Sequence, residues 1–494
     1  MARPMMTRIL VPLFLAVLAS QLAASHGRPV ARKATEASYD YADNGGASTL
    51  WNTESSFSSQ TSSFTDSRSG VDNVDSYASG GVSEDIYVDS PEIVHLDPNS
   101  DDVFFDTSNA ETVYKAPDHD GLSFSEYNVT EEKLEQMLDA LAKAMGGCGT
   151  GNPIDDCWRC DPNWRAHRQA LASCAVGFGR NALGGKNGPI YVVTNNGDDA
   201  QNPAPGTLRY GVTRDGPLWI TFAKSMTIQL KAELWVSSYK TIDGRGAEVH
   251  ITNQVTMKRV DHVILHGLHI HDVRPSGASA IRISPSKVVK KGTSEGDGIH
   301  IWGSNNIWVD HCYLAKATDG LVDITKGSTD VTVSNNYLTN HNKVMLLGAS
   351  PKDTMDRNMR ITVAFNKFGP GLVQRLPRAR YGVVHVLNND YSDGWGLYAI
   401  GGSEDPTILS QGNHFNAAST KEVTKRISDG GPTFGGWQKW NWASSGDVFL
   451  GGAFFTGSGA AASSSGVYAK AFSASSRPAT IVPAITKSAG PLSL

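Results

Sequence analysis

Short runs of apolar and polar residues recur at a regular interval in the second half of the chain. Five share one shape, in which β-branched or aliphatic residues lead to an Asn or Gly turn: WVDHCYL (308–314), TVSNNYL (332–338), TVAFNKF (362–368), HVLNNDY (385–391) and LSQGNHF (409–415). Their alignment places five residues in register, at spacings of 24, 30, 23 and 24: Cys312, Asn336, Asn366, Asn389 and Asn413. This interval predicts an all-β fold, a right-handed single-stranded parallel β-helix with stacked asparagines at one turn.

The gaps between these runs contain no helical period, so we expect bare turns between the parallel strands. The six additional residues between Asn336 and Asn366 should form an outward loop. The ends of a solenoid need covers. A helix beginning at Asp161 is predicted to cap the N-terminal end, with apolar and aromatic residues along one stripe. Trp437, Trp440 and Trp442 are expected to be buried against the coil rather than to stack on sugars.

The chain divides into segments of different composition. Residues 1–25 resemble a secretory signal peptide, with Arg3 and Arg8 before an apolar run. Residues 26–120 hold 18 acidic and 5 basic side chains and read as an acidic, Ser-rich disordered arm. Residues 121–149 are assigned to an amphipathic helix and linker, 150–460 to the β-helix, and 461–494 to a tail packing outside the coil. The signal peptide predicts a secreted protein, extracellular or in the cell wall, and no later segment is long and apolar enough to span a membrane.

Because the net charge of the whole chain is −5, the part beyond the acidic arm and the signal is basic. This charge suits an anionic partner. In the linker, Thr130 can cap an amphipathic helix that ends at Gly147, and Asn128 begins a glycosylation sequon.

Five cysteines fit the extracellular expectation. Cys157 and Cys174 flank the predicted Asp161 helix and are candidates for a disulfide. The pairing of Cys148 and Cys160 stays open, and Cys312 stands alone.

Two pairs of carboxylates occur one repeat apart. Glu295 and Asp297 lie in SEGDG, and Asp319 and Asp323 lie in DGLVD, with 24 residues between Glu295 and Asp319. All four can therefore converge on neighbouring coils. Clustered carboxylates bind hard cations, so this set predicts a Ca²⁺ site.

A basic segment, VQRLPRARYG (373–382), presents Arg375, Arg378 and Arg380 around Pro377. Guanidinium groups bind carboxylates in a bidentate fashion, which favours a carboxylate-rich polymer as ligand over a merely solvated basic edge. Which of the three share a face stays open, because the proline and the turn can reset strand alternation.

Many segments together resemble one family: NPIDDCWRCDPNW, GFGRNALGG, PGTLRYGV, KTIDGRG, NNIWVDHCYL, DGLVDITKGST, NKVMLLG, GLVQRLPRARYG, HVLNNDY and YAIGGSEDPTILSQGN. They are similar to the plant-type pectate lyases and related pollen allergens of the first polysaccharide lyase family, over about residues 150 to 490. The resemblance implies a parallel β-helix, a Ca²⁺ cofactor and β-elimination in de-esterified pectate. It implies Arg375 as catalytic base and Lys343 and Arg380 as binders of substrate carboxylates. The family usually has Asp where Glu295 stands.

Several alternatives remain at this stage. Arginine is an unusual base because its pKa exceeds about 12, so Arg375 is either the base or an electrostatic clamp. The carboxylates would serve a hydrolase as well as a metal site. A non-catalytic pectate-binding or allergen-like wall protein is also possible, although the basic residues that the resemblance names are all present. Asp310 and His311 are adjacent and are expected to have a structural role. We expect a polygalacturonate partner, no nucleic acid or membrane, and a monomer.

Overall fold

The computed structural model describes residues 149–428, 434–460 and 475–493. The predicted signal peptide, the acidic arm, the Thr130–Gly147 helix, Asn128 and Cys148 lie outside these residues. Among the described helices, none has the length and apolar character needed to cross a bilayer.

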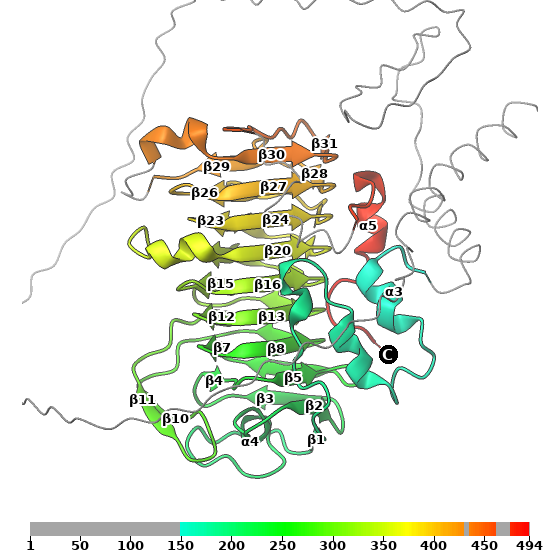
Figure 1. Ribbon diagram of the computed structural model, residues 1–494, viewed down its shortest axis with the longest axis vertical. Coiled ribbons are helices and arrows are strands. Elements are labelled where there is room, and N and C mark those ends of the chain that lie inside the picture. The colour runs from blue at the N-terminus through cyan, green and yellow to red at the C-terminus, as the bar shows by residue number, and fades with distance from the viewer. Residues whose placement is uncertain (1–148, 429–433, 461–474, 494) are drawn as a thin grey trace, which may run out of the picture. The chain divides into compact units, whose positions relative to one another are not determined.

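Three sheets of parallel strands form the stack seen in Figure 1. The first sheet contains, in spatial order, β1 (Ile190–Val193), β2 (Leu218–Phe222), β5 (Lys240–Asp243), β8 (Asp261–His266), β13 (Asn305–Asp310), β16 (Thr329–Ser334), β20 (Arg360–Ala364), β24 (Val383–Leu387), β27 (Thr407–Gln411) and β30 (Trp442–Ser445).

The second sheet contains β3 (Met226–Gln229), β6 (Val249–Thr252), β9 (His269–His271), β14 (Tyr313–Ala315), β17 (Tyr337–Thr339), β21 (Lys367–Phe368), β25 (Asp390–Tyr391), β28 (His414–Asn416) and β31 (Val448–Leu450). The third sheet contains β4 (Leu234–Trp235), β7 (Val255–Lys258), β12 (Ile299–Trp302), β15 (Val322–Thr325), β19 (Met345–Leu347), β23 (Arg378–Ala379), β26 (Ile400–Gly402) and β29 (Thr424–Arg426). The chain visits the sheets in turn, so the predicted parallel β-helix is confirmed.

Two small sheets flank the stack. Strands β10 (Ser279–Arg282) and β11 (Val288–Lys291) form an antiparallel hairpin, and β18 (His341–Lys343) pairs in parallel with β22 (Leu372–Gln374). The hairpin projects from the lower part of the stack in Figure 1.

Each of the five predicted runs crosses from the first sheet to the second through a bend. A residue with positive φ comes before each aligned position, for example Asn335 (52°) and Asn388 (49°). The asparagine side chain then bonds to the next coil: Oδ1 of Asn389 accepts from the backbone N–H of Asn366 at 3.0 Å and from its Nδ2 at 2.9 Å. The predicted asparagine ladder is confirmed, and Oδ1 of Asp447 continues it by accepting from the N–H of Asn413 at 2.7 Å.

The expected outward loop is also present. Residues 348–359, between β19 and β20, include the 3₁₀ helix η4 (Thr354–Asn358). The corresponding connection between β15 and β16 is only three residues long, so the additional residues of this repeat are placed at this corner.

The helix predicted from Asp161 is wrong in its bounds. Helix α3 (Pro153–Arg159) begins earlier, because the Asn152 side chain accepts hydrogen bonds from the first turn and Pro153 occupies the first helical position. The carboxylate of Asp161 instead accepts from the N–H of Asn163 at 2.8 Å, in a turn. Helical structure resumes as the 3₁₀ helices η2 (Arg168–Ser173) and η3 (Phe178–Asn181).

The predicted place of this segment at the N-terminal end is wrong too. Trp158 and Leu171 are buried against Trp219, Ile264 and Trp308 on the outer face of the first sheet, so the segment lies along the side of the stack (Figure 1). Outward aromatic and aliphatic residues on that sheet need an apolar cover there.

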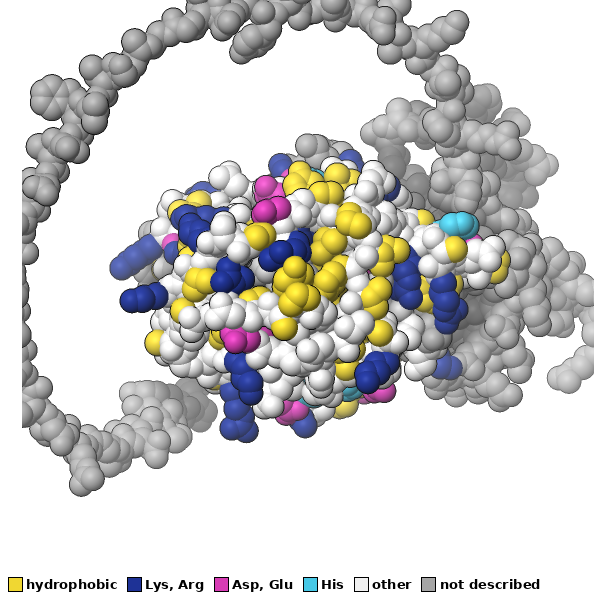
Figure 2. All heavy atoms as spheres, turned by 90° about the horizontal axis from the view of Figure 1, so that it is seen from below, with side chains coloured by type: hydrophobic (Ala, Val, Ile, Leu, Met, Phe, Trp, Pro, Cys, Tyr) yellow, Lys and Arg dark blue, Asp and Glu magenta, His cyan; other side chains and the backbone are white. Residues whose placement is uncertain are grey.

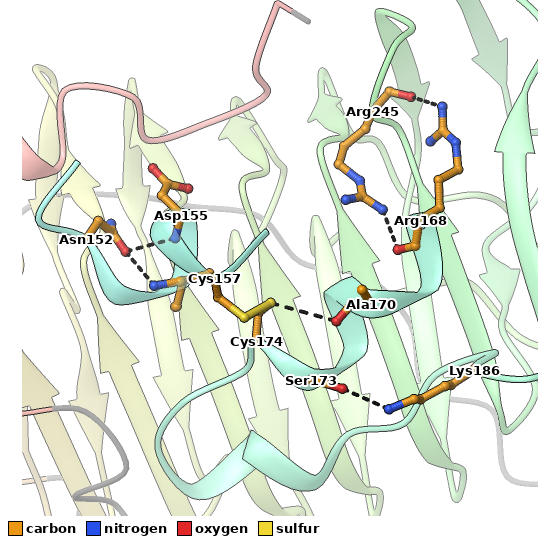
Figure 3. The surroundings of a disulfide bond; sticks show 10 residues. Asn152, Asp155, Cys157, Arg168, Ala170, Ser173, Cys174, Lys186 and Arg245 are labelled. Atoms are coloured by element: carbon orange, nitrogen blue, oxygen red, sulfur yellow. Dashed lines mark hydrogen bonds between the residues drawn. A yellow bond between two sulfur atoms is a disulfide. The ribbon is translucent and has the colours of Figure 1, made fainter. Parts of the chain in front are cut away.

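The Cys157–Cys174 disulfide joins α3 to the residue after η2 (Figure 3) and is confirmed. Cys160 is also disulfide-bonded, and Cys312 is free and buried. The loop that the Cys157–Cys174 bond closes holds the covering segment together beside the sheet.

A different helix covers the N-terminal end. Leu208 and Val212 of α4 (Leu208–Val212) are buried in the interior of the coil, next to the first strands. Figure 2 views this end, where hydrophobic side chains gather across the middle with Lys and Arg side chains around them.

Coiling continues to β31, and the last turns are closed by buried Trp440 and Trp442, while Trp437 on η5 (Phe434–Lys439) is partly buried. The expected burial of these tryptophans is confirmed. The described C-terminal residues run back outside the coil and form η7 (Ala479–Ile481) and α5 (Val482–Ile485). Val482 and Ile485 of α5 bury their side chains in the same cluster as Trp158 of α3.

Candidate active site

The four predicted carboxylates come together on the third sheet. Glu295 and Asp297 precede β12, Asp319 precedes β15, and Asp323 lies on β15. Because β12 pairs with β15, Asp323 is placed next to His300, three residues after Asp297. Two neighbouring coils thus contribute two carboxylates each.

Gly320 lies against the two buried aspartates of this group. A Cβ atom built on it would lie 2.1 Å from Oδ1 of Asp323 and 3.2 Å from Oδ1 of Asp297. Its N–H donates to Oδ1 of Asp297 at 2.8 Å, whereas Oδ1 of Asp323 has no hydrogen-bond partner among the described residues. The lack of a side chain at residue 320 leaves room for these oxygens to face a ligand.

Burial and like charge act on both aspartates. Burial raises the pKa of Asp297 to about 6. Burial, and then the charge of Asp297, raises the pKa of Asp323 well above its ordinary value. Both effects disfavour two ionised carboxylates without a nearby cation.

Glu295 has a different environment from these two. Its side chain is 43% exposed, accepts a hydrogen bond from Nε2 of Gln254 at 3.1 Å and lies 3.3 Å from Nζ of Lys291. The contact with His300, followed by these partners, lowers the pKa of Glu295 below its ordinary value although burial opposes the shift. Glu295 therefore lies at the rim of the group, and its negative charge is already stabilised by His300, Gln254 and Lys291.

The donor set fits Ca²⁺. It offers carboxylate oxygens, one of them buried and without a partner, and the ligand that such hard donors prefer is a hard cation. The raised pKa values of Asp297 and Asp323 have the sign expected of a site whose own charges are balanced only by a bound ion. Asp297, Asp319 and Asp323 would hold the ion, with Glu295 at the edge.

The predicted basic residues lie on the following two coils. Lys343 on β18 pairs in register with Gln374 on β22, and Arg375 comes next in the chain. Nζ of Lys343 lies 2.9 Å from Oδ1 of Asp319, and the charge of Arg375 acts on Asp323. The structure therefore brings cations and carboxylates to one surface.

Arg375 has an unusual backbone conformation. Its φ is 65°, in the left-handed region that residues other than Gly, Asn and Asp rarely adopt. The side chain is half-buried, and its Nε has no hydrogen-bond partner among the described residues. A strained backbone that holds a half-buried guanidinium near the Asp323 carboxylate indicates a functional constraint.

Arg378 on β23 and Arg380, which directly follows this strand, lie on one face, because the intervening Ala379 is buried in the interior of the coil. Each is only 8% exposed. Nη2 of Arg378 donates to Oγ of Ser403 at 2.6 Å, and Nη1 of Arg380 donates to the carbonyl of Gly348. Arg380 thus contributes its charge from below the surface.

Sequence reasoning missed a supporting layer of polar residues. Oε1 of Gln254 accepts from the N–H groups of Gly296 (2.9 Å) and Asp297 (3.2 Å), and so fixes the turn that carries Asp297. Buried Glu233 accepts from Thr256 Oγ1 at 2.7 Å. His300 and Asp323 are neighbours only through coil packing, so a single coil gave no signal for these contacts.

The structural role expected for Asp310 and His311 is confirmed. Nε2 of His311 lies 2.8 Å from Oδ1 of Asp155 on α3, and Nδ1 lies 2.9 Å from the Gly490 carbonyl. Asp310 accepts from Oγ of Ser334 at 2.6 Å. The pair fixes α3 and the C-terminal tail against the first sheet.

Known proteins identify the family. A family model described as Pectate lyase matches residues 175–490. The chain belongs to the pectate lyase family. A pectate lyase of Zinnia elegans is 54% identical over 368 residues, which cover 73% of this chain and 90% of that protein. Probable pectate lyase 5 of Arabidopsis thaliana is 53% identical over 376 residues, 74% of this chain and 91% of that protein.

Among solved structures, the crystal structure of jun a 1, the major allergen from cedar pollen, matches with a TM-score of 0.67 and 48% identity. The match covers 69% of this chain and 100% of the allergen. These relatives confirm the resemblance inferred from the motifs and the expectation of an enzyme, a pectate lyase.

Proposed function

We propose that the protein is a Ca²⁺-dependent pectate lyase that cleaves the (1→4)-α-D-galacturonan of de-esterified pectin by elimination, giving oligosaccharides with unsaturated galacturonosyl ends. One observation carries the proposal: two buried carboxylates, Asp297 and Asp323, whose pKa values are raised by burial and like charge, belong to the same surface as Lys343 and Arg375. We further propose that it acts outside the cell, on wall pectin, as a monomer.

The reaction removes the proton beside a uronate carboxylate and expels the glycosidic oxygen from the next carbon. Negative charge then develops on that carboxylate, so cations must stabilise it. Ca²⁺ would supply a divalent charge that binds the substrate carboxylate and makes the neighbouring proton more acidic. Lys343, with a side chain 43% exposed, is positioned to exchange Asp319 for a substrate carboxylate. Arg380 adds positive charge from beneath.

In this proposal Arg375 takes the proton. Its half-buried side chain lies on the surface that also presents Lys343, where the substrate carboxylate would bind.

The test is the ultraviolet absorbance of polygalacturonate incubated with the protein, with Ca²⁺ or with a chelator. Elimination creates a conjugated, absorbing product, and we expect it to need both Ca²⁺ and Arg375. Arg375→Ala should abolish the absorbance rise, whereas Arg360→Ala should keep it, because Arg360 pairs with Asp330 elsewhere on the surface. New reducing ends without absorbance would indicate hydrolysis by catalytic carboxylates. Binding without cleavage would indicate a wall-binding protein.

The variant Arg375→Lys distinguishes between two roles for residue 375, a catalytic base and an electrostatic clamp. If residue 375 gives up its proton, the alkaline activity should begin at lower pH with lysine, because lysine is the weaker base by roughly 2 pKa units. If residue 375 only clamps the substrate, the variant loses activity without a shift of its pH profile.

A further inference from the structure

A second polar cluster lies on the second sheet, away from the carboxylates of the third. Glu248 precedes β6, His250 lies on β6, and His269 and His271 lie on β9. The register pairs His250 with His269, and the adjacent Ile251 and Ile270 are fully buried in the coil. Because strand residues alternate, the histidines point outward from two successive coils.

A chain of hydrogen bonds fixes which histidine nitrogen carries a proton. Nδ1 of His271 lies 2.6 Å from Oδ2 of Asp272, and a carboxylate can only accept, so this nitrogen donates. Nε2 of neutral His271 is then an acceptor. Nδ1 of His250, 2.8 Å away, must donate to it.

The proton on Nδ1 of His250 determines what the other ring nitrogen, Nε2, can bind. With Nδ1 protonated, the Nε2 of neutral His250 carries a lone pair, and it lies 3.2 Å from Oε1 of Glu248. Two acceptors at this distance repel unless a cation lies between them. That cation is either one additional proton on the hydrogen-bonded pair of His250 and His271 or a metal ion.

The third histidine favours the metal. One ligand atom each from Glu248, His250 and His269 all lie within 4.8 Å of one another. The His250 and His269 rings are stacked, with centroids 4.4 Å apart and planes 18° from parallel. Bonds of about 2.0–2.2 Å to a tetrahedral ion separate its ligands by roughly 3.3 Å, close to the His250–Glu248 distance.

There is space for the ion and for a further ligand. A surface cavity of about 310 Å³ beside His250 and His269 is also lined by His271, Asp272, Tyr313 and Lys316, and Glu248 and His269 line a second cavity of about 530 Å³. Two imidazoles and one carboxylate are donors that suit Zn²⁺ rather than Ca²⁺.

We propose that Glu248, His250 and His269 form a binding site for a transition-metal ion of the Zn²⁺ type, separate from the Ca²⁺ site. His271 and Asp272 orient His250 through the hydrogen-bond chain, as carboxylates do for metal-binding histidines. The ion links β6 to β9, so its binding stabilises consecutive coils of the folded chain.

The experiment measures Zn²⁺ uptake by the chelator-stripped protein in competition with a chromophoric chelator, in excess Ca²⁺ so that hard carboxylate sites are filled. We expect one Zn²⁺ per chain and a rise in thermal midpoint on binding. His269→Gln should weaken binding by at least about tenfold, and Asp272→Asn by roughly 10- to 100-fold. His414→Gln, on the same sheet but outside the cluster, should bind as the unchanged protein does.

Glu248→Gln guards against misfolding of the histidine variants, because the Glu248 side chain is 66% exposed. It should keep the fold and weaken Zn²⁺ binding. Equal uptake by the unchanged protein, Glu248→Gln and His269→Gln would overturn the proposal. So would the lack of stoichiometric uptake by the unchanged protein, which would leave an additional proton on the His250–His271 pair as the cation.

Discussion

Replacement of Gly320 by alanine should disable the proposed Ca²⁺ site without disturbing the coil. The new Cβ would lie 2.1 Å from Oδ1 of Asp323, whereas real Cβ atoms essentially never approach within 3.0 Å. The carboxylate must therefore retreat by about 1 Å, more than the spread of about 0.3 Å in Ca²⁺–oxygen distances. Loss of one such ligand should weaken Ca²⁺ binding by roughly 10- to 100-fold, or about 1.4–2.8 kcal/mol.

Titration calorimetry with Ca²⁺ measures this change directly, and the Ca²⁺ dependence of the absorbance assay gives a second value. Gly277→Ala is the matched control, because its new Cβ meets nothing within 4 Å and neither glycine has a positive φ. Thermal unfolding checks that both variants fold. If Gly320→Ala binds Ca²⁺ as tightly as Gly277→Ala does, Asp323 is not a ligand and the assignment of this site fails.

Three further predictions concern the stability of the fold. Asn389→Leu removes a fully buried amide from the ladder and leaves several buried polar groups without partners, so denaturant unfolding should show that the unfolding free energy falls by roughly 3–5 kcal/mol. The control Asn416→Ala removes one half-buried donor and should lower the unfolding free energy by only about 1 kcal/mol. Burial opposes the charge of His311, but Asp155 and Asp310 raise its pKa from 6.5 to about 9. The contribution of protonated His311 to the free energy of unfolding should be complete below pH 6.5 and should be lost as the pH rises through about 9. Urea unfolding should show this loss as a decline of at most roughly 3 kcal/mol, and His311→Gln should show no such decline. Cys157→Ser opens a disulfide that spans 17 residues, and denaturant unfolding should show a loss of about 3 kcal/mol in the unfolding free energy.

The repeat could be predicted from the sequence because each coil imposes the same local requirement. An asparagine side-chain amide must reach both the coil before and the coil after it, so the residue type recurs at one register and is visible in the sequence. The covering segment obeys no such repetition. Asn152 and Asp161 are both acceptable caps, and only the contacts of Trp158 with the first sheet decide between the helices that they would start.

The residues of the candidate site also divide into those that could be predicted from the sequence and those that could not. Asp297 and Asp323 stand one coil apart and could be predicted to meet, because spacing and residue type together carry the signal. Gln254 lies on the preceding coil, 42 and 43 residues from the N–H groups that it fixes, across the inserted β10–β11 hairpin that breaks the repeat. The burial of Arg380 was equally hidden, because it depends on the loop at residues 348–359 rather than on the strand that carries it.

Regular stacking explains how one surface comes to hold charges of both signs. Neighbouring strands lie about 4.8 Å apart, so side chains on successive coils keep this spacing whatever their charge. Two carboxylates about 5 Å apart repel by roughly 3 kcal/mol at an effective dielectric constant of about 20, and Asp297 and Asp323 oppose each other in this sense. The strand pairing tolerates that repulsion because the backbone hydrogen bonds between β12 and β15 do not involve these two side chains. A cation bound between the carboxylates would replace their repulsion by attraction, and under the proposed function Lys343 and Arg375 on the next two coils would bind adjoining residues of a polyanion.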